Sequence, residues 1–500
     1  MDDWAEVDRA LGVLAASGNA EVREDGEWLA EFATLECEVR QSGKNSLVRL
    51  RSGERNLTRR VLRVAEQSAD RIVLEVQRFG RAKPSRLEFV RCDSPRPAGR
   101  VTREQFRARF RRILSERFPD AIIESITAAP DLEHSFSGLY ARGRMREGEC
   151  AWAFLAAPGG GARDSTAIEG ILAFGIIWLD WSRSHAERRA IEGLRLFVPE
   201  GTSRALRERL LAVSPTARAE VFEFRERDGE MLRVEAAGEG NLESWLVPRR
   251  EAESLCAEAR EAIGRIHALA LHLPPAGDEI RLRLLPGAKE VAICFRGLEF
   301  ARWSREGLTF GLSDSRERLT ATAEPALDRL VRQIDLRRSS LATETTHPLY
   351  RAAPERWLET LILEDPARLD AQLNPRHLYS QVPALAAGDR GVLDLLGVTR
   401  RGRLVVIECK ASEDIQMPFQ AIDYWLRVRR LQREGGFERF GYFAGVELDP
   451  RPPLVWLVAP GLRFHSATDT VLKYLSPEIH VTRAGLNENW RRGLRVIFRQ

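Results

Sequence analysis

The chain has 500 residues, of which 44% are hydrophobic and 30% charged, as in ordinary soluble globular proteins. This length exceeds what one hydrophobic core supports and predicts three or four domains. The longest apolar run, Gly170–Leu179, is too short to cross a bilayer. We therefore expect a buried strand or helix there and no membrane association.

The formal net charge is +4, and residues 348–500 account for it, with 22 Lys and Arg against 18 Asp and Glu. This excess weakly favours a polyanionic partner such as nucleic acid. The six cysteines lie far apart, without Cys-x-x-Cys or Cys/His spacing, which argues against zinc or iron–sulfur sites and for reduced thiols. The acidic N-terminus lacks the form of a signal peptide, so we expect a cytoplasmic protein.

Residues 1–97 are predicted to form a β-rich module with strands that include Ser46–Arg51 and Arg71–Gln77. Arg49 and Arg51 belong to a run of basic residues in this module, so the module is a candidate nucleic-acid contact. The alternative is an ordinary solvated face of the sheet.

Residues 98–245 are predicted to be an α/β domain that follows a Pro-rich linker. Thr102 and Gln105 fit a capping box at the start of its first helix. Three arginines share one face of this helix and could follow phosphates: Arg103, Arg107 and Arg111. The alternative is again a solvated helix face.

Residues 246–345 are predicted to be an α+β domain with a helix over 249–271, several strands and a second helix over Glu324–Arg337. The polar stretch Arg338–Thr346 is predicted to be a linker. No internal repeat is obvious in the sequence, and nothing before residue 346 identifies a reaction.

The last domain, residues 346–500, begins with a helix at Pro354 that carries Glu359. The strands Val392–Val398 and Leu404–Ala411 follow, and a short turn joins them. These signals predict a helix followed by a β-hairpin.

The connection Thr399–Arg403 sets the register of this hairpin. If its glycine takes the left-handed position of a three-residue loop, its two ends pair, and counting outward puts Asp394 opposite Glu408. Cross-strand partners share a face, and strand alternation puts Lys410 on the same face as Glu408. The sequence therefore predicts that these three side chains converge, and a one-residue slip would separate them.

Lys410 is conspicuous because only five of the 77 basic residues are lysine. A lysine amine can shift its pKa and so orient or deprotonate a water, whereas arginine stays protonated. Two adjacent carboxylates repel each other unless a cation lies between them, and Mg²⁺ is bound by one or two carboxylates plus waters. The carbonyl of Cys409 could add an oxygen ligand. We therefore expect metal-dependent phosphodiester hydrolysis; the alternative is a solvated Glu–Lys ion pair.

The next predicted helix places Gln420 and Tyr424 on one side, four residues apart. Together these residues resemble the PD-(D/E)XK nuclease superfamily, with its RecB-like and archaeal mismatch-endonuclease branches. The motif residues are Glu359, Asp394, Glu408-Cys409-Lys410 and Gln420-Ala-Ile-Asp-Tyr424. One departure is Leu393, which stands where many members have proline.

The resemblance implies a restriction-endonuclease-like α/β core, with a mixed central sheet flanked by helices, that cleaves DNA with Mg²⁺ or Mn²⁺. It implies metal ligation by Asp394 and Glu408, with Glu359 as the helix acid at the rim of the site. Lys410 would position the water, and Gln420 and Tyr424 would support the site or hold the DNA strand. The sequence leaves two alternatives open: a non-catalytic nucleic-acid-binding protein on a nuclease fold, and an RNA nuclease.

Overall fold

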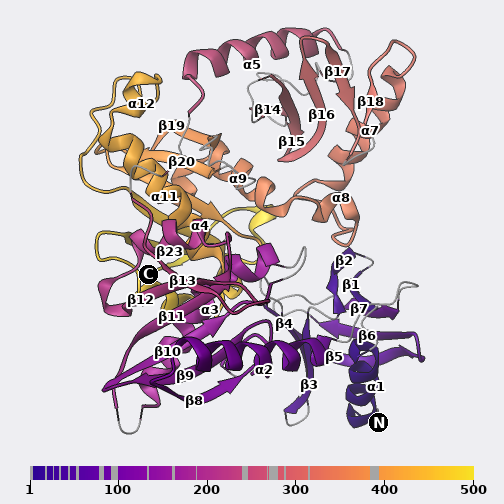
Figure 1. Cartoon of the computed structure of the whole chain (residues 1–500). Coiled ribbons are helices and arrows are strands. Elements are labelled where there is room, and N and C mark those ends of the chain that lie inside the picture. Colours follow the sequence, from indigo (N-terminus) through magenta and orange to yellow (C-terminus); the bar gives the residue numbers. More distant parts are fainter. Residues whose placement is uncertain are drawn as a thin grey trace. The chain divides into compact units, whose positions relative to one another are not determined.

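The structure of the chain is a computed structural model (Figure 1). It describes residues 4–16, 20–25, 27–32, 35–42, 45–51, 56–77, 84–91, 99–131, 134–159, 164–186, 189–238, 242, 246–266, 269, 280–285, 289–312, 316–382 and 393–500. The chain divides into two compact units. Unit 1 comprises Met1–Gly238, Glu413–Phe419 and Phe464–Pro477; unit 2 comprises Glu239–Ser412, Gln420–Arg463 and Glu478–Gln500. The predicted mixture of helices and sheets is confirmed.

The first sheet of unit 1 is antiparallel and confirms that the N-terminal region is rich in strands. Its strand order is β2-β1-β7-β6-β5-β4-β3. Its elements are α1 (Trp4–Ala16), β1 (Ala20–Glu24), β2 (Glu27–Glu31), β3 (Glu36–Ser42), β4 (Asn45–Arg51), β5 (Asn56–Gln67), β6 (Arg71–Gln77) and β7 (Ser85–Arg91). Alternating apolar residues such as Val48, Leu74 and Phe89 pack against Leu11 of α1 and form the core.

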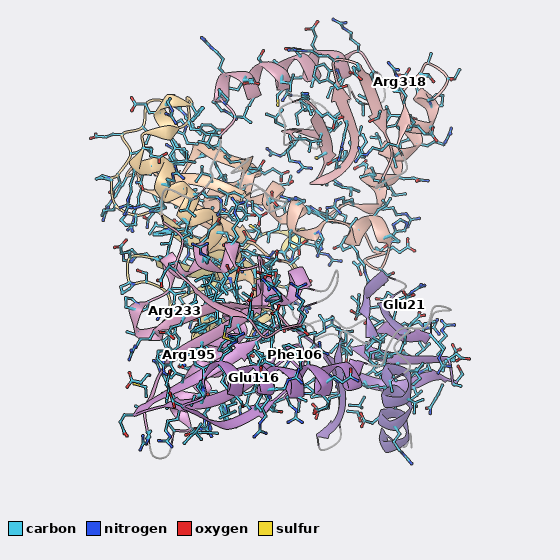
Figure 2. All side chains as sticks on the ribbon, viewed as in Figure 1. Glu21, Phe106, Glu116, Arg195, Arg233 and Arg318 are labelled. Atoms are coloured by element: carbon cyan, nitrogen blue, oxygen red, sulfur yellow. The ribbon has the colours of Figure 1, made fainter. Side chains whose placement is uncertain are left out.

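The second sheet of unit 1 is mixed, with the order β13-β12-β11-β10-β9-β8. Its elements are α2 (Gly99–Arg117), β8 (Ala121–Thr127), β9 (Ala141–Glu147), β10 (Cys150–Ala156), α3 (Asp164–Ser184), β11 (Ile191–Pro199), α4 (Arg204–Arg209), η2 (Leu210–Ala212), η3 (Pro215–Ala217), β12 (Ala219–Phe224) and β13 (Met231–Val234). Arg195 of β11, labelled in Figure 2, is buried in this sheet between Glu147 and Glu220.

Two local expectations are settled in this part of unit 1. The apolar run Gly170–Leu179 lies in helix α3, whose residues are buried on nearly every side, which is why its pattern did not separate helix from strand. The capping-box prediction is wrong, because α2 begins at Gly99 and Thr102 lies inside the helix. Propensity alone rarely fixes a helix end.

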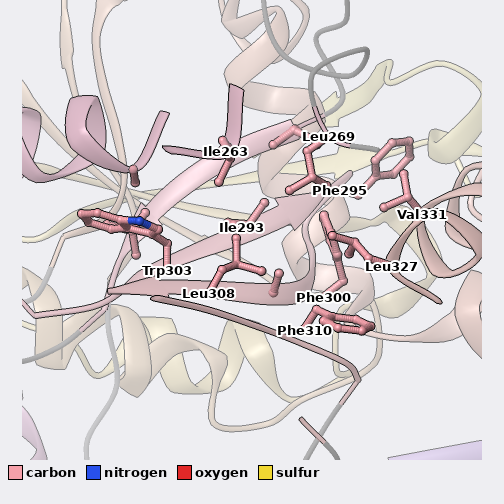
Figure 3. Packing of buried hydrophobic residues seen from close by; sticks show 14 of the residues in the cluster. Ile263, Leu269, Ile293, Phe295, Phe300, Trp303, Leu308, Phe310, Leu327 and Val331 are labelled. Atoms are coloured by element: carbon pink, nitrogen blue, oxygen red, sulfur yellow. The ribbon is translucent and has the colours of Figure 1, made fainter. Parts of the chain in front are cut away.

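The first sheet of unit 2 is an antiparallel meander with the order β14-β15-β16-β17-β18. Its elements are α5 (Arg249–Gly264), β14 (Ile280–Leu284), β15 (Val291–Phe295), β16 (Leu298–Ser304), β17 (Gly307–Phe310), β18 (Glu317–Arg318) and α7 (Glu324–Arg337). Figure 3 shows Ile263 of α5 and Leu327 of α7 packed with Phe295 and Phe300 of the sheet. The predicted bounds of α7 are confirmed, whereas α5 ends at Gly264, earlier than predicted.

Arg338, at the start of the predicted linker, is fully buried. Its guanidinium donates to the carbonyls of Arg296, Leu349, Ala352 and Ala353, at 2.5 to 3.0 Å. These bonds fasten the end of α7 to the residues that precede α9.

The last sheet is mixed and has the order β19-β20-β21-β22-β23-β24. Its strands are β19 (Leu373–Val382), β20 (Leu393–Thr399), β21 (Leu404–Cys409), β22 (Leu454–Pro460), β23 (His480–Leu486) and β24 (Val496–Arg499). The helices in this part of the chain are α8 (Pro348–Arg351), α9 (Pro354–Glu364), α10 (Pro366–Leu369), α11 (Met417–Arg433), α12 (Gly436–Arg439), η5 (Gly461–Arg463), α13 (Thr468–Lys473) and η6 (Trp490–Arg492). No helix in the described ranges combines the length and apolar character needed to cross a membrane.

Candidate active site

The hairpin of β20 and β21 has the register that the sequence predicts. Its outermost ladder pair is Leu395 with Ile407, so the next position sets Asp394 across from Glu408. Gly402 has a φ of 84°, the left-handed conformation that the loop requires. The turn chemistry therefore brings the two acidic positions together.

Glu408 lies on the face of the sheet that α11 covers. Cys409 packs in the apolar cluster that contains Trp357 of α9, whereas Val406 packs in the cluster that contains Val428 of α11. Because side chains alternate along a strand, Glu408 points to the side of Val406, whereas the oxygens of Asp394 contact Arg356 of α9 and the backbone N–H of Cys409.

Glu408 and Lys410 form an ion pair, with Nζ 3.3 Å from Oε1. The Glu408 side chain is 5% exposed and that of Lys410 is 19% exposed. The backbone N–H of Lys410 donates to the carbonyl of Val458 in β22 at 2.9 Å, so the sheet still holds the lysine after its strand ends. This burial disfavours the alternative of a solvated surface pair.

Asp394 is held from two sides. Its Oδ2 accepts the backbone N–H of Cys409 at 2.9 Å, and its Oδ1 lies 3.5 Å from Nη1 of Arg356. The same Nη1 donates to Oε1 of Glu359 at 2.8 Å. A guanidinium from α9 therefore lies between two of the predicted site carboxylates, an arrangement that the sequence did not indicate.

Helix α9 carries two acidic residues at the edge of the site. Glu355 and Glu359 lie one turn apart, and Oε1 of Glu355 accepts the backbone N–H of Ala411 at 3.3 Å. The opposite side of α9 is anchored by Trp357 and Ile362 in the core. This packing fixes Glu359, which is 3% exposed, beside the end of the hairpin.

Burial shifts the pKa values of these groups. It raises the pKa of Glu359 to about 8, with repulsion from Asp394 adding to the rise. Burial also raises the pKa of Asp394, against the opposing effect of the Arg356 charge. Burial lowers the pKa of Arg356, but Glu359 and Asp394 outweigh it, so the pKa lies above its ordinary value and the guanidinium stays charged.

Helix α11 supplies the polar groups of the covering layer. Burial, and then the charges of Glu408 and Asp394, raise the pKa of Tyr424, so its phenol remains neutral and can donate a hydrogen bond. One turn earlier, the amide Oε1 of Gln420 is buried and has no hydrogen-bond partner among the described residues. A buried acceptor left unsatisfied costs about 1 to 3 kcal/mol, which a bound water or ligand would offset.

The oxygen donors of this site suit Mg²⁺ or Mn²⁺. Burial and the nearby carboxylates raise the pKa of the Cys409 thiol well above its ordinary value, so only its carbonyl could serve as a ligand. The described residues contain no group of three or more His, Cys, Asp or Glu placed as a ligand set. A cation held at this site would have Asp394 and Glu408 as its carboxylate ligands, with water and substrate oxygens completing its shell. Glu359 faces Arg356 instead.

The predicted arginine contacts have mixed outcomes. Arg51 is 4% exposed and donates to the carbonyl of Asp131 at 2.7 Å, so the prediction of an exposed phosphate contact is wrong for this residue. Arg107 pairs with Glu104 at 2.8 Å. Three more stay predictions, being half-buried or exposed: Arg49, Arg103 and Arg111.

A basic hollow that the sequence did not reveal lies at the start of α5. Its volume is about 460 Å³, and its cationic lining residues are Arg249, Arg250, Arg376 and Arg439. Among its described lining residues the acid is Glu253, which pairs with Arg249 at 2.9 Å. These arginines come from three distant segments, so only the fold reveals that they gather.

A second hollow, of about 740 Å³, shares Arg249, Glu253 and Tyr379 with the first. It is also lined by Ser380 and Val382 of β19. These two residues pair with Leu395 and Leu393, the two neighbours of Asp394 in β20. The hollows, which we call the basic groove, therefore run along the strand next to the candidate site.

A scan against protein-family models and a search of curated proteins both found no match to this chain.

Proposed function

We propose that this protein is a metal-dependent DNA nuclease whose reaction centre is Asp394, Glu408 and Lys410. The observation that supports this most is the hairpin register, which sets Asp394 across from Glu408 with the Lys410 amine 3.3 Å from Glu408. Withdrawing two carboxylates from solvent is costly, and groups of this kind are concentrated at functional sites. Metal-dependent phosphodiester hydrolysis is a reaction that groups of this kind can carry out.

Each group has a role in this proposal. Asp394 and Glu408 would hold Mg²⁺ or Mn²⁺, and the chemistry gained there is polarisation of the phosphate and a lower pKa for the attacking water. The amine of Lys410, neutral once a cation has taken over Glu408, would hold this water and accept its proton as the water adds to phosphorus. The P–O ester bond would then break, and the leaving oxygen would take a proton from solvent. The neutral phenol of Tyr424 and the amide of Gln420 would donate hydrogen bonds to phosphate oxygens.

The basic groove would lead the substrate strand along β19, the strand next to this centre. Four arginines line its first hollow, and its second hollow is lined by Ser380 and Val382 of β19, which pair with the two neighbours of Asp394 in β20. Arginine guanidinium groups bind phosphates without reading the base sequence. A polyanionic strand therefore fits the charge of the groove.

The test is cleavage of single-stranded, duplex, flapped and mismatched DNA, and of matched RNA, with Mg²⁺ or Mn²⁺. We expect the wild-type protein to cut at least one DNA substrate and Lys410→Ala to lose this activity. Lys473→Ala is the matched control, because Lys473 forms an exposed pair with Asp180. Equal cleavage by the wild type and Lys410→Ala would contradict the proposal, and preferential cleavage of RNA would assign the activity to RNA.

A second candidate function is nucleic-acid binding without cleavage. The observation that favours it is Arg356, whose charge already lies between Asp394 and Glu359 and could replace a metal ion there. This alternative expects salt-dependent DNA binding and no turnover with either metal.

A further inference from the structure

The mixed sheets of unit 1 and unit 2 have the same strand topology. In each, the six described strands are neighbours in chain order, β8 to β13 in one and β19 to β24 in the other. The first two neighbouring pairs are antiparallel, the next two are parallel and the last is antiparallel. The same five directions recur in the same order in the second sheet.

The helices also recur at the same points of the path. Helix α2 precedes the first strand of its sheet, as α9 precedes β19. Helix α3 connects the third and fourth strands, as α11 does, and α4 lies between the fourth and fifth, as α13 does. Parallel neighbours need such crossover connections, but nothing in that rule requires the antiparallel pairs to match as well.

One backbone hydrogen bond aligns the two sheets residue by residue. The N–H of Ala157 donates to the carbonyl of Phe197 at 2.9 Å, and the N–H of Lys410 donates to that of Val458, also at 2.9 Å. In each sheet the accepting strand ends two residues later, at a proline. Ala157 therefore holds the position of Lys410.

This alignment identifies the residues of the first sheet that correspond to Asp394, Glu408 and Lys410. Two residues before Ala157, Leu155 occupies the position of Glu408. In the first sheet Leu155 pairs with Arg142 across the hairpin, so Arg142 occupies the position of Asp394. Neither carboxylate nor the lysine is present at the matching positions.

The residues around Arg142 differ chemically from those of the candidate site. Arg142 is 5% exposed, and its guanidinium lies 4.7 Å from the ring centre of Phe136 and 5.7 Å from that of Trp178 on α3. A cation already packed between aromatic rings would repel a divalent metal ion. The matching site of the first sheet therefore cannot bind metal as Asp394 and Glu408 would.

We propose that the chain contains two copies of one fold, residues 99–234 and 354–499, and that the first copy is catalytically silent. Each copy follows a helix and an antiparallel sheet, α1 with β1 to β7 and α5 with β14 to β18, and these two preceding sheets differ in strand order. The duplication rests on topology and register alone. The assignment of a single reaction centre rests on the proposed function.

An X-ray structure of crystals soaked with Mn²⁺ tests both parts. We expect the two copies to superpose strand for strand, with Ala157 on Lys410, and anomalous Mn²⁺ density only beside Asp394 and Glu408. If the copies superpose but Mn²⁺ binds at neither site, the duplication would stand and the proposed function would be contradicted. Copies that do not superpose, or Mn²⁺ beside Arg142 and Leu155, would overturn the proposal.

A solution experiment separates the copies without crystals. We expect Mn²⁺ titration, followed by electron paramagnetic resonance, to show binding that Asp394→Asn removes and that Arg142→Gln leaves within twofold of the wild type. Circular dichroism checks that both variants fold. Binding that survives Asp394→Asn and is lost in Arg142→Gln would place the metal in the first copy and overturn the assignment.

Discussion

Lys410 shows how a single residue type carries information in this chain, where only five of 77 basic residues are lysine. Its amine lies 3.3 Å from a nearly buried carboxylate, where a planar guanidinium that stays protonated cannot take up a proton. We therefore expect Lys410→Arg to lower kcat on DNA by about 100-fold or more, nearly as much as Lys410→Ala. Lys473→Arg is the control. Near-normal cleavage by the Lys410→Arg variant would show that Lys410 contributes only a positive charge.

Arg356 is the residue whose place the sequence did not indicate. Its guanidinium compensates Glu359 and Asp394, so its removal leaves buried carboxylates without that cation. We expect Arg356→Ala to lower the Tm of the metal-free protein and to show a larger rise in Tm with Mn²⁺ than the wild type, because the added cation then relieves more repulsion. Thermal unfolding with and without Mn²⁺ measures both effects.

Arg332→Ala is the matched control for this experiment, because Arg332 forms an exposed pair with Asp328 one turn away. Its Mn²⁺ response is expected to equal that of the wild type. An Arg356→Ala protein whose Tm rises with Mn²⁺ no more than the wild type would show that Arg356 does not compete with the metal.

Among the elements, the hairpin was predictable because its signals are local. A glycine at the left-handed loop position and the two-residue strand period fix the register. The burial of Arg51 by Asp131 and the position of Arg356 were not predictable, because they depend on contacts between distant segments. The start of α2 at Gly99 was missed because a capping pattern also occurs inside helices.

Gly402 provides the left-handed loop conformation on which the hairpin register depends. Its φ is 84°, and a Cβ at this position would overlap the carbonyl oxygen of Glu447. We expect Gly402→Ala to lower the free energy of unfolding by more than about 2 kcal/mol, from strain plus overlap. Gly435→Ala is the control, since Gly435 has a φ of 66° with nothing near its missing Cβ and should cost about 1 kcal/mol.

Urea denaturation measures the two variants side by side. Equal losses in Gly402→Ala and Gly435→Ala would show that the loop can shift away from Glu447. The tight register of the hairpin would then need another cause.

The basic groove is the second element that the fold assembles. We expect Arg376→Ala with Arg439→Ala, in an Asp394→Asn background that prevents cleavage, to weaken DNA binding about tenfold or more. The slope of log K against log salt should fall by about 2, one for each lost phosphate contact. Fluorescence anisotropy over a salt series measures both quantities.

The control for the groove combines Arg305→Ala with Arg332→Ala, two exposed arginines of unit 2 that pair with nearby acids. Its salt slope is expected to match that of the background protein. An unchanged slope in the Arg376 and Arg439 variant would show that the DNA does not follow the groove.

At the scale of the whole molecule, the two mixed sheets share one strand order, and the chemistry that we propose belongs to the second. This repeat was not obvious in the sequence because topology is preserved by apolar patterns that many residues satisfy. The positions that a comparison of motifs would use are the ones that differ, with Leu155 and Arg142 in place of Glu408 and Asp394. Strand order and register therefore reveal a relation that residue identity does not.

The central claim is that Asp394 holds the metal for DNA cleavage. The most direct measurement is the Mn²⁺-dependent cleavage rate of DNA by the wild type, Asp394→Asn and the control Asp328→Asn, whose parent residue forms an exposed pair with Arg332. We predict a loss on the order of 10³-fold for Asp394→Asn, since several kcal/mol of transition-state stabilisation disappear, and none for Asp328→Asn. Equal cleavage by the wild type and Asp394→Asn would contradict the claim.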